Sequence, residues 1–278
     1  MQKMITLVGI DELVSSIRDG DTLAIPTMLG DFSGVSMAAT RAIIRRGVRN
    51  LDIVCVPSSS LQADMLIGAG CVRSIQSGGV LLYEYGPAAR FAEAQRTGEL
   101  NVREATCPAI QAALTAAEKG LPFMPLRGII GSDILRQRSG DWKVIDNPFS
   151  ENDPIVAVPA IRPDVALFHA PMGDRFGNLW IGRRASFRLM AHAARATLAT
   201  VESIYEGNFF DDPKLVPGVI PANYVTAVSH QPRGAWPLHF GKDYPEDVEH
   251  MKLYAAASKT REGFDAYLEL HVFDAVAV

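Results

Sequence analysis

Apolar runs alternate with amphipathic stretches along this chain, and the alternation predicts strands separated by helices. Residues 165–169 form an apolar run without polar alternation, which is typical of a strand buried on both faces of a parallel sheet. Leu51–Val56 is a second such run. Residues 36–46 have the spacing of a helix, and Gly47 suits its C-cap. The pattern therefore predicts an α/β fold with an open, mostly parallel sheet flanked by helices.

Weaker patterns complete the predicted order of elements. Further strands are expected at residues 22–25, 71–74, 78–83, 100–103, 179–181, 199–201 and 224–229. Further helices are expected at residues 11–18 (with Asp11 as N-cap), 62–69, 88–96, 107–119, 187–196, 246–257 and 261–271. The Pro- and Gly-rich tract 122–133 is interpreted as a loop, and residues 136–154 as a polar excursion or hairpin. Because the sequence shows no internal repeat or linker, we expect one domain over residues 1–278.

The composition argues against several classes of protein. The 278 residues carry a net charge of −4, whereas nucleic-acid-binding proteins normally have a basic surplus, so we expect no nucleic acid as partner. No apolar run approaches the roughly 18–20 residues of a membrane span, and the amino terminus has no small-residue cleavage site. We therefore expect no membrane association and a cytoplasmic location. The three cysteines show no CxxC spacing, which favours buried thiols over a disulfide framework or a zinc site.

Three consecutive serines, Ser58, Ser59 and Ser60, follow the predicted strand Leu51–Val56. At the carboxyl end of a parallel strand, their hydroxyl and backbone N–H groups are placed to hold a carboxylate, a thioester oxygen or a phosphate. A helix N-cap with a turn is the alternative interpretation. No GxSxG motif surrounds these serines, so a nucleophile of the hydrolase kind has no support. The earlier loop at residues 26–34 lacks GxGxxG and GxxxxGK[ST], which excludes nucleotide binding of those kinds.

A second candidate site lies in the Pro- and Gly-rich tract, where Arg127 and Gly128 are followed by Ser132 and Asp133. An arginine in such a loop can clamp a carboxylate or phosphate through two parallel N–H donors. Equally, Asp133 is placed to pair with Arg127 and simply fix the loop. The residues leave both interpretations open.

His169, at the end of the run 165–169, is interpreted as a satisfied core residue and not as a catalyst. No second histidine or carboxylate stands at metal-ligand spacing from it, so no metal site is expected. Asp174 and Asn178 are interpreted as turn formers, with Asn178 following Gly177 in a hairpin. From the residues alone, no self-contained catalytic set is evident.

Several longer tracts match the sequence motifs of a known protein family. They are residues 66–72 (LIGAGCV), 120–135 (GLPFMPLRGIIGSDIL), 157–170 (AVPAIRPDVALFHA) and 174–178 (DRFGN), and residues 41–54 fit the same pattern. Together they resemble the α (A) subunit of class I CoA-transferases, closest to the glutaconate CoA-transferase type. The likeness extends over about residues 10–230. It implies an open α/β subunit that pairs with a homologous β subunit, either as a separate chain or fused.

The resemblance implies that the two subunits contribute different groups to the reaction. Members of this family move CoA from an acyl-CoA to a carboxylate, with the CoA thioester as substrate and no permanently bound cofactor. Their nucleophile is a glutamate of the β subunit, which forms a mixed anhydride and then a glutamyl-CoA thioester. No catalytic residue is then expected in this chain. Its expected share is to bind the acyl-CoA and the carboxylate through the serine turn and the Arg127 loop.

Two departures from the family's pattern keep other functions open. Transferase α subunits usually carry a Gly-Gly-Phe-type turn after the first strand, where this chain has PTMLGDF at residues 26–32. A hydrolytic ring-opening branch carries a glutamate in the stretch matching residues 103–110, where this chain has Cys107. The principal hypothesis is an α subunit of a transferase for a small carboxylic or dicarboxylic acid. The alternatives are a ring-opening subunit for a cyclic acyl-CoA in steroid or aromatic catabolism, and a non-catalytic acyl-CoA-binding paralogue.

Overall fold

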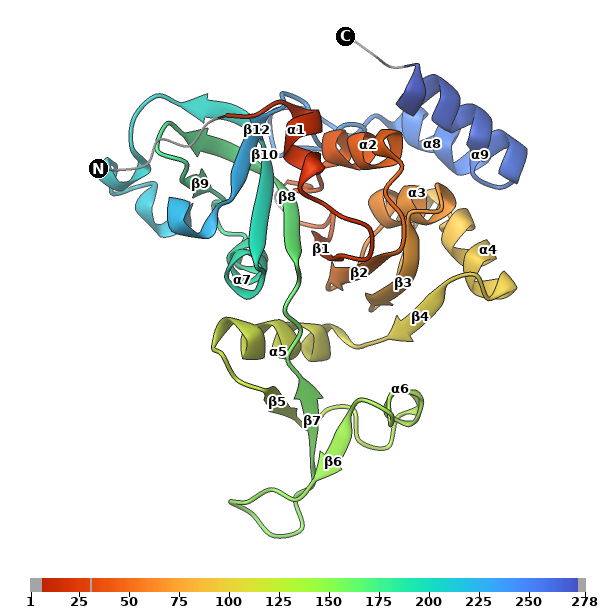
Figure 1. Ribbon diagram of the computed structural model, residues 1–278, viewed down its shortest axis with the longest axis vertical. Helices are drawn as coiled ribbons and strands as arrows, with labels where there is room; N and C mark the ends of the chain where they lie inside the picture. Colours follow the sequence, from red (N-terminus) through yellow and green to blue (C-terminus); the bar gives the residue numbers. More distant parts are fainter. Residues whose placement is uncertain (1–6, 31, 275–278) are drawn as a thin grey trace.

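The computed structural model describes residues 7–30 and 32–274, and its body is a nine-stranded, mostly parallel sheet with helices on both faces (Figure 1). The strands of the body are β1 (Thr22–Pro26), β2 (Leu51–Val56), β3 (Val72–Ser77), β4 (Asn101–Glu104), β8 (Val165–Asp174), β9 (Leu179–Trp180), β10 (Ala196–Tyr205), β11 (Val219–Ile220) and β12 (Ala227–His230). The helices of the body are α1 (Ile10–Ser15), α2 (Met37–Arg46), α3 (Leu61–Gly68), α4 (Ala89–Thr97), α5 (Cys107–Glu118), α7 (Ala185–Ala193), α8 (Val248–Ala257) and α9 (Arg261–Leu268). The predicted fold class is confirmed.

β8 is the central strand of the body. Its first six residues are all buried, as the apolar run predicts, and it pairs in parallel with β1 on one side and β10 on the other. The sheet continues in parallel from β1 to β2, β3 and β4. At its carboxyl end β8 turns back into the antiparallel strand β9. The Asp174 carboxylate accepts the N–H groups of Phe176 and Asn178 at 2.9 Å each, which confirms the predicted hairpin turn.

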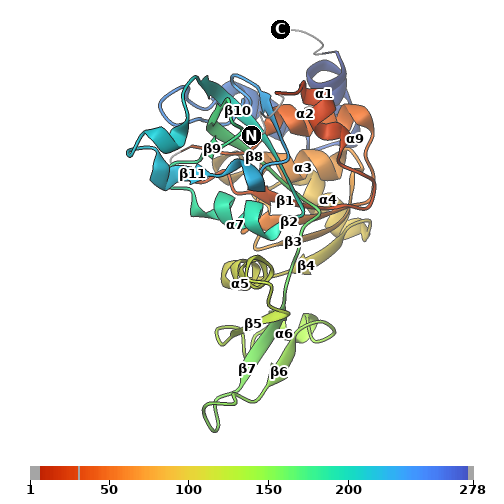
Figure 2. The same cartoon turned by 60° about the vertical axis from the view of Figure 1, so that its left-hand side comes forward.

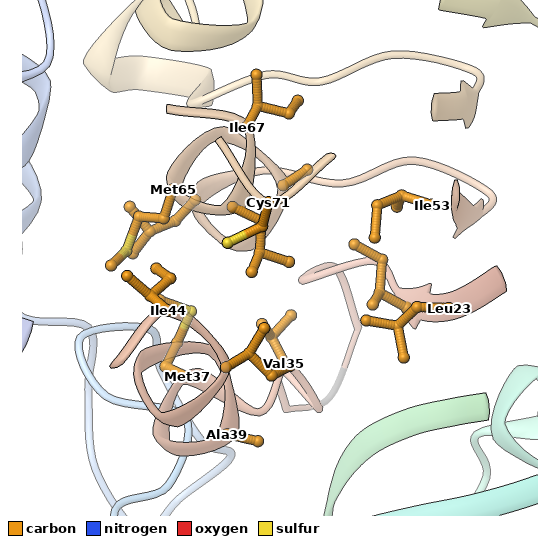
Figure 3. Close-up of a cluster of buried hydrophobic side chains, with 14 of the residues drawn as sticks. Leu23, Val35, Met37, Ala39, Ile44, Ile53, Met65, Ile67 and Cys71 are labelled. Atoms are coloured by element: carbon orange, nitrogen blue, oxygen red, sulfur yellow. The ribbon is translucent and has the colours of Figure 1, made fainter. Parts of the chain in front are cut away.

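Successive residues of the buried strands point to opposite faces of the sheet and enter two separate hydrophobic clusters. Leu23 and Ile53 belong to one cluster, whereas their neighbours Ala24 and Val54 belong to the other. The first cluster packs under α1, α2, α3, α8 and α9, and Figure 3 shows its centre between α2, α3 and the strands. The second cluster packs under α5 and α7. Because helices cover both faces, the loops at the strand ends are left to form sites.

Residues 121–159 form an extension that projects from the body and has a sheet of its own (Figures 1 and 2). It contains β5 (Phe123–Leu126), α6 (Asp133–Gln137), β6 (Lys143–Ile145) and β7 (Ile155–Pro159), with the strands antiparallel in the order β5-β7-β6. The Arg138 guanidinium ties the extension to the body. Its carbon lies 4.3 Å from the centre of the Trp142 ring, and it donates a hydrogen bond to the Gln76 side chain of β3 (3.2 Å).

Three local predictions are wrong. Residues 78–83 form isolated bridges instead of a strand, because Gly79 (φ +157°) and Tyr83 (φ +52°) leave the extended conformation. The loop predicted at residues 122–133 contains β5, whose pairing partner β7 lies about 30 residues further on. The first helix has Gly9 as its N-cap in place of Asp11. The helix before Gly47 does end there, and this glycine takes the left-handed conformation (φ +72°) that the C-cap needs.

Some predictions concern residues outside the described part of the chain. Residues 1–6, on which the expected absence of a signal peptide partly rests, lie outside it, as does Asp31 of the loop at 26–34. Within residues 7–30 and 32–274, no helix combines the length and the apolar character needed to cross a membrane. The prediction of one domain stays a prediction.

Candidate functional site at the strand ends

The loops that follow β1, β2, β3 and β4 lie along one edge of the body, because these four strands run parallel. Thr27, after β1, and Ser58, after β2, have their hydroxyl oxygens 3.3 Å apart. The Ser59 N–H, also after β2, donates to the Gly79 carbonyl after β3 (3.1 Å). We call these loops together the strand-end site, which comprises residues 27–30, 32–34, 57–60, 78–82 and 105–107.

Gly78 is the point at which three of these loops come together. A Cβ atom added there would lie 3.4 Å from the Cys107 sulfur, 3.4 Å from the Pro57 carbonyl oxygen and 3.5 Å from the Ala105 carbonyl oxygen. These are ordinary contact distances, so Gly78 leaves a space about the size of a methyl group among the three loops. Cys107 therefore belongs to the strand-end site, although no local motif in the sequence marks it as a binding residue.

The three serines lie at the carboxyl end of β2, as predicted. Ser58 is half-buried, whereas Ser59 and Ser60 are buried. Ser60 is the N-cap residue of α3, as the alternative interpretation has it, but its hydroxyl caps no backbone N–H. Among the described residues, no hydrogen-bond partner exists for the Ser60 hydroxyl. Unpartnered buried hydroxyls are rare in folded proteins and mark positions that a bound group can satisfy.

Helix α3, which begins behind the serines, is anchored by Asp64. The Tyr254 hydroxyl of α8 and the Phe91 N–H of α4 each donate to its carboxylate at 2.7 Å. Burial is the largest influence on this carboxyl and raises the pKa of Asp64 to about 6, although both hydrogen bonds oppose that shift. All eight residues of α3 are buried. Asp64 therefore holds the position of the serine turn and does not face the strand-end site.

Helix α5 has its amino end at the same loops. The Thr106 hydroxyl caps this helix by accepting the Ala109 N–H (3.3 Å), and the exposed Cys107 is its first residue. The first-turn N–H groups of a helix carry the positive end of its dipole and attract anions. In this first turn Pro108 has no N–H and the Ala109 N–H is bonded to Thr106, so Cys107 is the residue whose N–H can serve as a donor to a carboxylate or a thioester oxygen. The described residues of the strand-end site include no Asp, Glu or His, so these residues offer donors but no carboxylate nucleophile.

Arg127 lies in the extension, in the exposed loop between β5 and α6. Its guanidinium donates to both carboxylate oxygens of Asp153, at 2.9 and 2.5 Å. These bonds, with one from Asn147 (2.7 Å), lower the pKa of Asp153 to about 2. Asp133 pairs instead with Arg136, one turn along α6. The predicted alternative of an Arg127–Asp133 pair is therefore wrong.

The remaining predicted residues of this loop differ in environment. Ser132 is the N-cap of α6, and its hydroxyl accepts the Leu135 N–H (3.3 Å). Gly128 is open, since an added Cβ there would meet no atom within 4 Å. An apolar groove of about 620 Å³ runs beside Arg127, with Phe123, Leu126, Ile145, Phe149 and Ile155 among its lining residues.

The structure does not bring the two candidate sites into contact. Every hydrogen bond and ion pair of the Arg127 side chain within the described chain is made to Asp153 of the same extension. In Figure 1 the extension and the loop after β2 occupy different parts of the molecule. Ser58–Ser60 thus share a site with Cys107, while Arg127 lies apart from them.

His169 has a carboxylate partner that spacing along the chain did not reveal. The ring is fully buried, with Nε2 2.9 Å from the Glu202 carboxylate and Nδ1 2.8 Å from the Thr200 hydroxyl. Both partners lie on β10, where Thr200 stands opposite His169 in the parallel register. Burial is the largest influence and lowers the pKa of His169. His169 is a satisfied core residue, as predicted, and its carboxylate partner comes from the pairing of β8 with β10.

Comparison with known proteins points to one family. A model of the coenzyme A transferase family matches residues 8–228. The chain is 31% identical to the A subunit of 3-oxoadipate CoA-transferase from Pseudomonas knackmussii, over 97% of this chain and 94% of that protein. It is 33% identical to an uncharacterized protein of Archaeoglobus fulgidus, with 96% of this chain but 59% of that longer protein covered.

The fold leads to the same group of proteins. The structure is similar to that of glutaconate coenzyme A-transferase from Acidaminococcus fermentans, with a TM-score of 0.88. The match covers 96% of this chain and 89% of that chain, at 28% sequence identity. The likeness in fold is therefore nearly complete, although fewer than a third of the residues are the same.

Proposed function

The chain belongs to the coenzyme A transferase family as an α-type subunit, and we propose that with a separate β chain it moves coenzyme A from an acyl-CoA to a small carboxylic or dicarboxylic acid. The observation that carries the proposal is the family match over residues 8–228. The strand-end site supports it, because its described residues supply hydrogen-bond donors without a carboxylate nucleophile. We therefore assign the reactive group to a second chain.

We assign the binding of the thioester to the strand-end site. Cys107, at the start of α5, and the Pro57 carbonyl lie around the space beside Gly78, and Ser58 and Ser60 belong to the loop that contains Pro57. Donors directed at an oxygen that gains negative charge stabilise a tetrahedral intermediate, by about 3–4 kcal/mol for a single donor in hydrolases. The contribution of this chain is therefore to bind the thioester and to stabilise its oxyanion.

We assign the nucleophile to a glutamate of the β chain. Its carboxylate attacks the acyl-CoA carbonyl, which gives a mixed anhydride on the glutamate and releases the CoA thiolate. The thiolate then attacks the glutamyl carbonyl, which releases the first acid and leaves a glutamyl-CoA thioester. The acceptor carboxylate repeats both steps in reverse and leaves as the new acyl-CoA. No water is consumed, so the acceptor acid is required for turnover.

Arg127 has a separate part in this proposal. Because it lies apart from the strand-end site, we assign to it a charged group distant from the thioester, either a carboxylate of the acid or a phosphate of CoA. The ion pair of Arg127 with Asp153 is exposed, and exposed ion pairs contribute little to the stability of the fold. Replacing Asp153 by a substrate oxyanion as the partner of Arg127 therefore costs little free energy. The apolar groove beside Arg127 offers a surface for an adjoining carbon chain.

The decisive experiment is reconstitution with a β chain. The two chains are co-expressed and purified together, and CoA transfer from a set of acyl-CoA donors to small acids is measured. Incubation with acyl-CoA alone, followed by borohydride or hydroxylamine, should reveal a glutamyl-CoA thioester on the β chain. A complex that turns over without forming this adduct contradicts the proposal.

Leaving out the acceptor acid separates the alternatives. A transferase stops after one equivalent of adduct, whereas a ring-opening or thioester hydrolase continues to consume acyl-CoA with water. A complex that binds acyl-CoA but converts it under neither condition indicates the non-catalytic paralogue. Turnover that depends on the acceptor acid is the expected result.

A further inference from the structure

A small polar cavity of about 160 Å³ is lined by residues of β1, β2, β3 and β4 together with Ile161 and Arg162. Its lining includes Asp52, Gln76, Arg103 and Arg162. We propose that this cavity binds a compact oxyanion, either free inorganic phosphate or a single phosphate group of a larger molecule.

An unpaired buried donor is the first observation behind this proposal. Gln76 is 4% exposed, and its Oε1 accepts a hydrogen bond from Arg138 (3.2 Å). Because an arginine can only donate, this bond fixes which end of the amide is the oxygen. The NH₂ group of Gln76 is left without an acceptor among the described residues. Gln76 lines the cavity, so a donor without a partner lies in the cavity wall.

Surplus positive charge is the second observation. Four guanidinium groups stand at or next to the cavity, against two carboxylates, which leaves a surplus of two positive charges. The guanidinium groups belong to Arg73, Arg103, Arg138 and Arg162, and the carboxylates to Asp52 and Asp141. Both carboxylates are already saturated, Asp52 by Arg73 and Ser74, and Asp141 by the two arginines beside it. Asp164, which accepts the N–H of Thr22, has its own ion pair with Arg195 and leaves the surplus unchanged.

Two arginines that line the cavity, Arg103 and Arg162, keep N–H donors for a ligand. Arg162 is exposed, and the one hydrogen bond it makes to a described residue is to the Ala117 carbonyl (3.2 Å). Arg103 is 46% exposed and engages Asp141 through one of its two terminal nitrogens. Each therefore retains N–H groups for a ligand, and guanidinium groups bind phosphate through pairs of such donors. The cavity is too small for a nucleotide but has room for one oxyanion.

Titration of the full-length chain with inorganic phosphate tests the proposal. Calorimetry at low ionic strength should show saturable binding of one phosphate, with a dissociation constant of about 1 mM or lower, and sulfate should compete. Gln76→Glu replaces the free NH₂ with a carboxylate oxygen while keeping an acceptor for Arg138. Arg162→Gln removes one cation from an exposed position. Each substitution should weaken phosphate binding by at least about tenfold.

Arg175→Gln is the matched control, since it removes the same charge from the exposed β8–β9 turn, where Arg175 pairs with Glu206. This variant should bind phosphate like the wild type. The absence of saturable binding in the wild-type protein overturns the proposal. Unchanged affinity in both cavity variants, or equal losses in Arg162→Gln and Arg175→Gln, overturns it as well.

Competition identifies the source of the oxyanion. If CoA displaces phosphate and 3′-dephospho-CoA does not, the cavity holds the 3′-phosphate of CoA, a result that rests on the proposed function. If neither competes, the ligand is a free anion. Both outcomes support an oxyanion site, and neither depends on turnover, so failure of the proposed transferase activity leaves this test intact.

Discussion

The Ser58–Ser60 turn and the Arg127–Asp133 loop both offer donors to a substrate, yet the structure builds them in contrasting ways. The turn is mostly buried, is hydrogen-bonded to the loop after β3 and leads into a helix buried all round. The loop is exposed and is held by ion pairs on the surface. Substitutions of the packed side chains that support the turn therefore act on stability as well as on binding, whereas substitution of Arg127 in the loop should act mainly on binding.

The largest expected effect comes from the support of the turn. Leu66 of α3 is fully buried, so Leu66→Ala should lower the free energy of unfolding by about 2–5 kcal/mol through lost burial and a residual cavity. Phe149→Ala is the control in the extension, where this side chain is 95% exposed, and it should change stability by less than about 0.5 kcal/mol. Urea unfolding followed by circular dichroism measures both. Similar losses of unfolding free energy in the two variants would contradict the expected difference between the buried turn and the exposed loop.

The second expectation concerns pH. Burial raises the pKa of Asp64 to about 6 in the folded chain, against 3.8 for the ordinary carboxyl. The folded state thus holds the proton more tightly, so the stabilising contribution is complete below about pH 4 and is lost as pH rises through 6. Across this window, wild-type stability should fall by up to about 3 kcal/mol relative to Asp64→Asn, which does not titrate.

Urea unfolding at a series of pH values from about 4 to 7 tests this expectation. Asp133→Asn, in the exposed loop, is the control and should keep the wild-type pH dependence. If the stability curves of the wild type and Asp64→Asn run parallel across the range, Asp64 does not titrate there.

The third expectation tests the loop. Arg127→Ala should lower kcat/KM of the reconstituted complex by a factor equivalent to about 1–3 kcal/mol, because a charge-assisted pair with the substrate is lost. Its effect on stability should stay below about 1 kcal/mol, since the pair with Asp153 is exposed. Arg136→Ala, on the neighbouring exposed helix, should leave kcat/KM unchanged. An effect of Arg127→Ala on stability alone would assign this arginine a structural part.

The smallest effect on stability is expected at Ser60. Its hydroxyl has no partner among the described residues, so Ser60→Ala should change the free energy of unfolding by less than about 0.5 kcal/mol. Ser132→Ala is the matched comparison, because this hydroxyl does cap its helix, and it should cost about 1 kcal/mol. If the Ser60 hydroxyl binds the thioester, kcat/KM should nevertheless fall by at least about tenfold. Equal activity in the two variants would remove Ser60 from the site.

The parts of the fold that are determined by residues close together in the sequence were predictable from the sequence. Leu51–Val56 has the predicted bounds because an apolar run buried on both faces is a local signal. Gly47 and Gly98 end their helices in the left-handed conformation, again a local requirement. β5 was missed because an exposed, proline-containing segment becomes a strand only by pairing with β7, far along the chain.

The candidate site divides in the same way. The position of the three serines follows from the end of β2, so a strand prediction was sufficient to place them. The contact of Cys107 with the Gly78 loop depends on the packing of loops after three different strands, which no spacing encodes. Likewise, Glu202 reaches His169 only through the register of β8 and β10. A correct prediction of how β8 and β10 pair would have identified Glu202 as the partner of His169.

The extension leaves the body and returns to it at a single place. Phe123 of β5 stands opposite Pro159 of β7, and the Ala160 N–H donates to the Pro122 carbonyl (3.0 Å). Because the two ends are neighbours, the length of chain between them can change without altering the spacing of the body strands. In genetic terms, insertions and deletions within residues 123–159 can accumulate while the parental sheet is inherited intact.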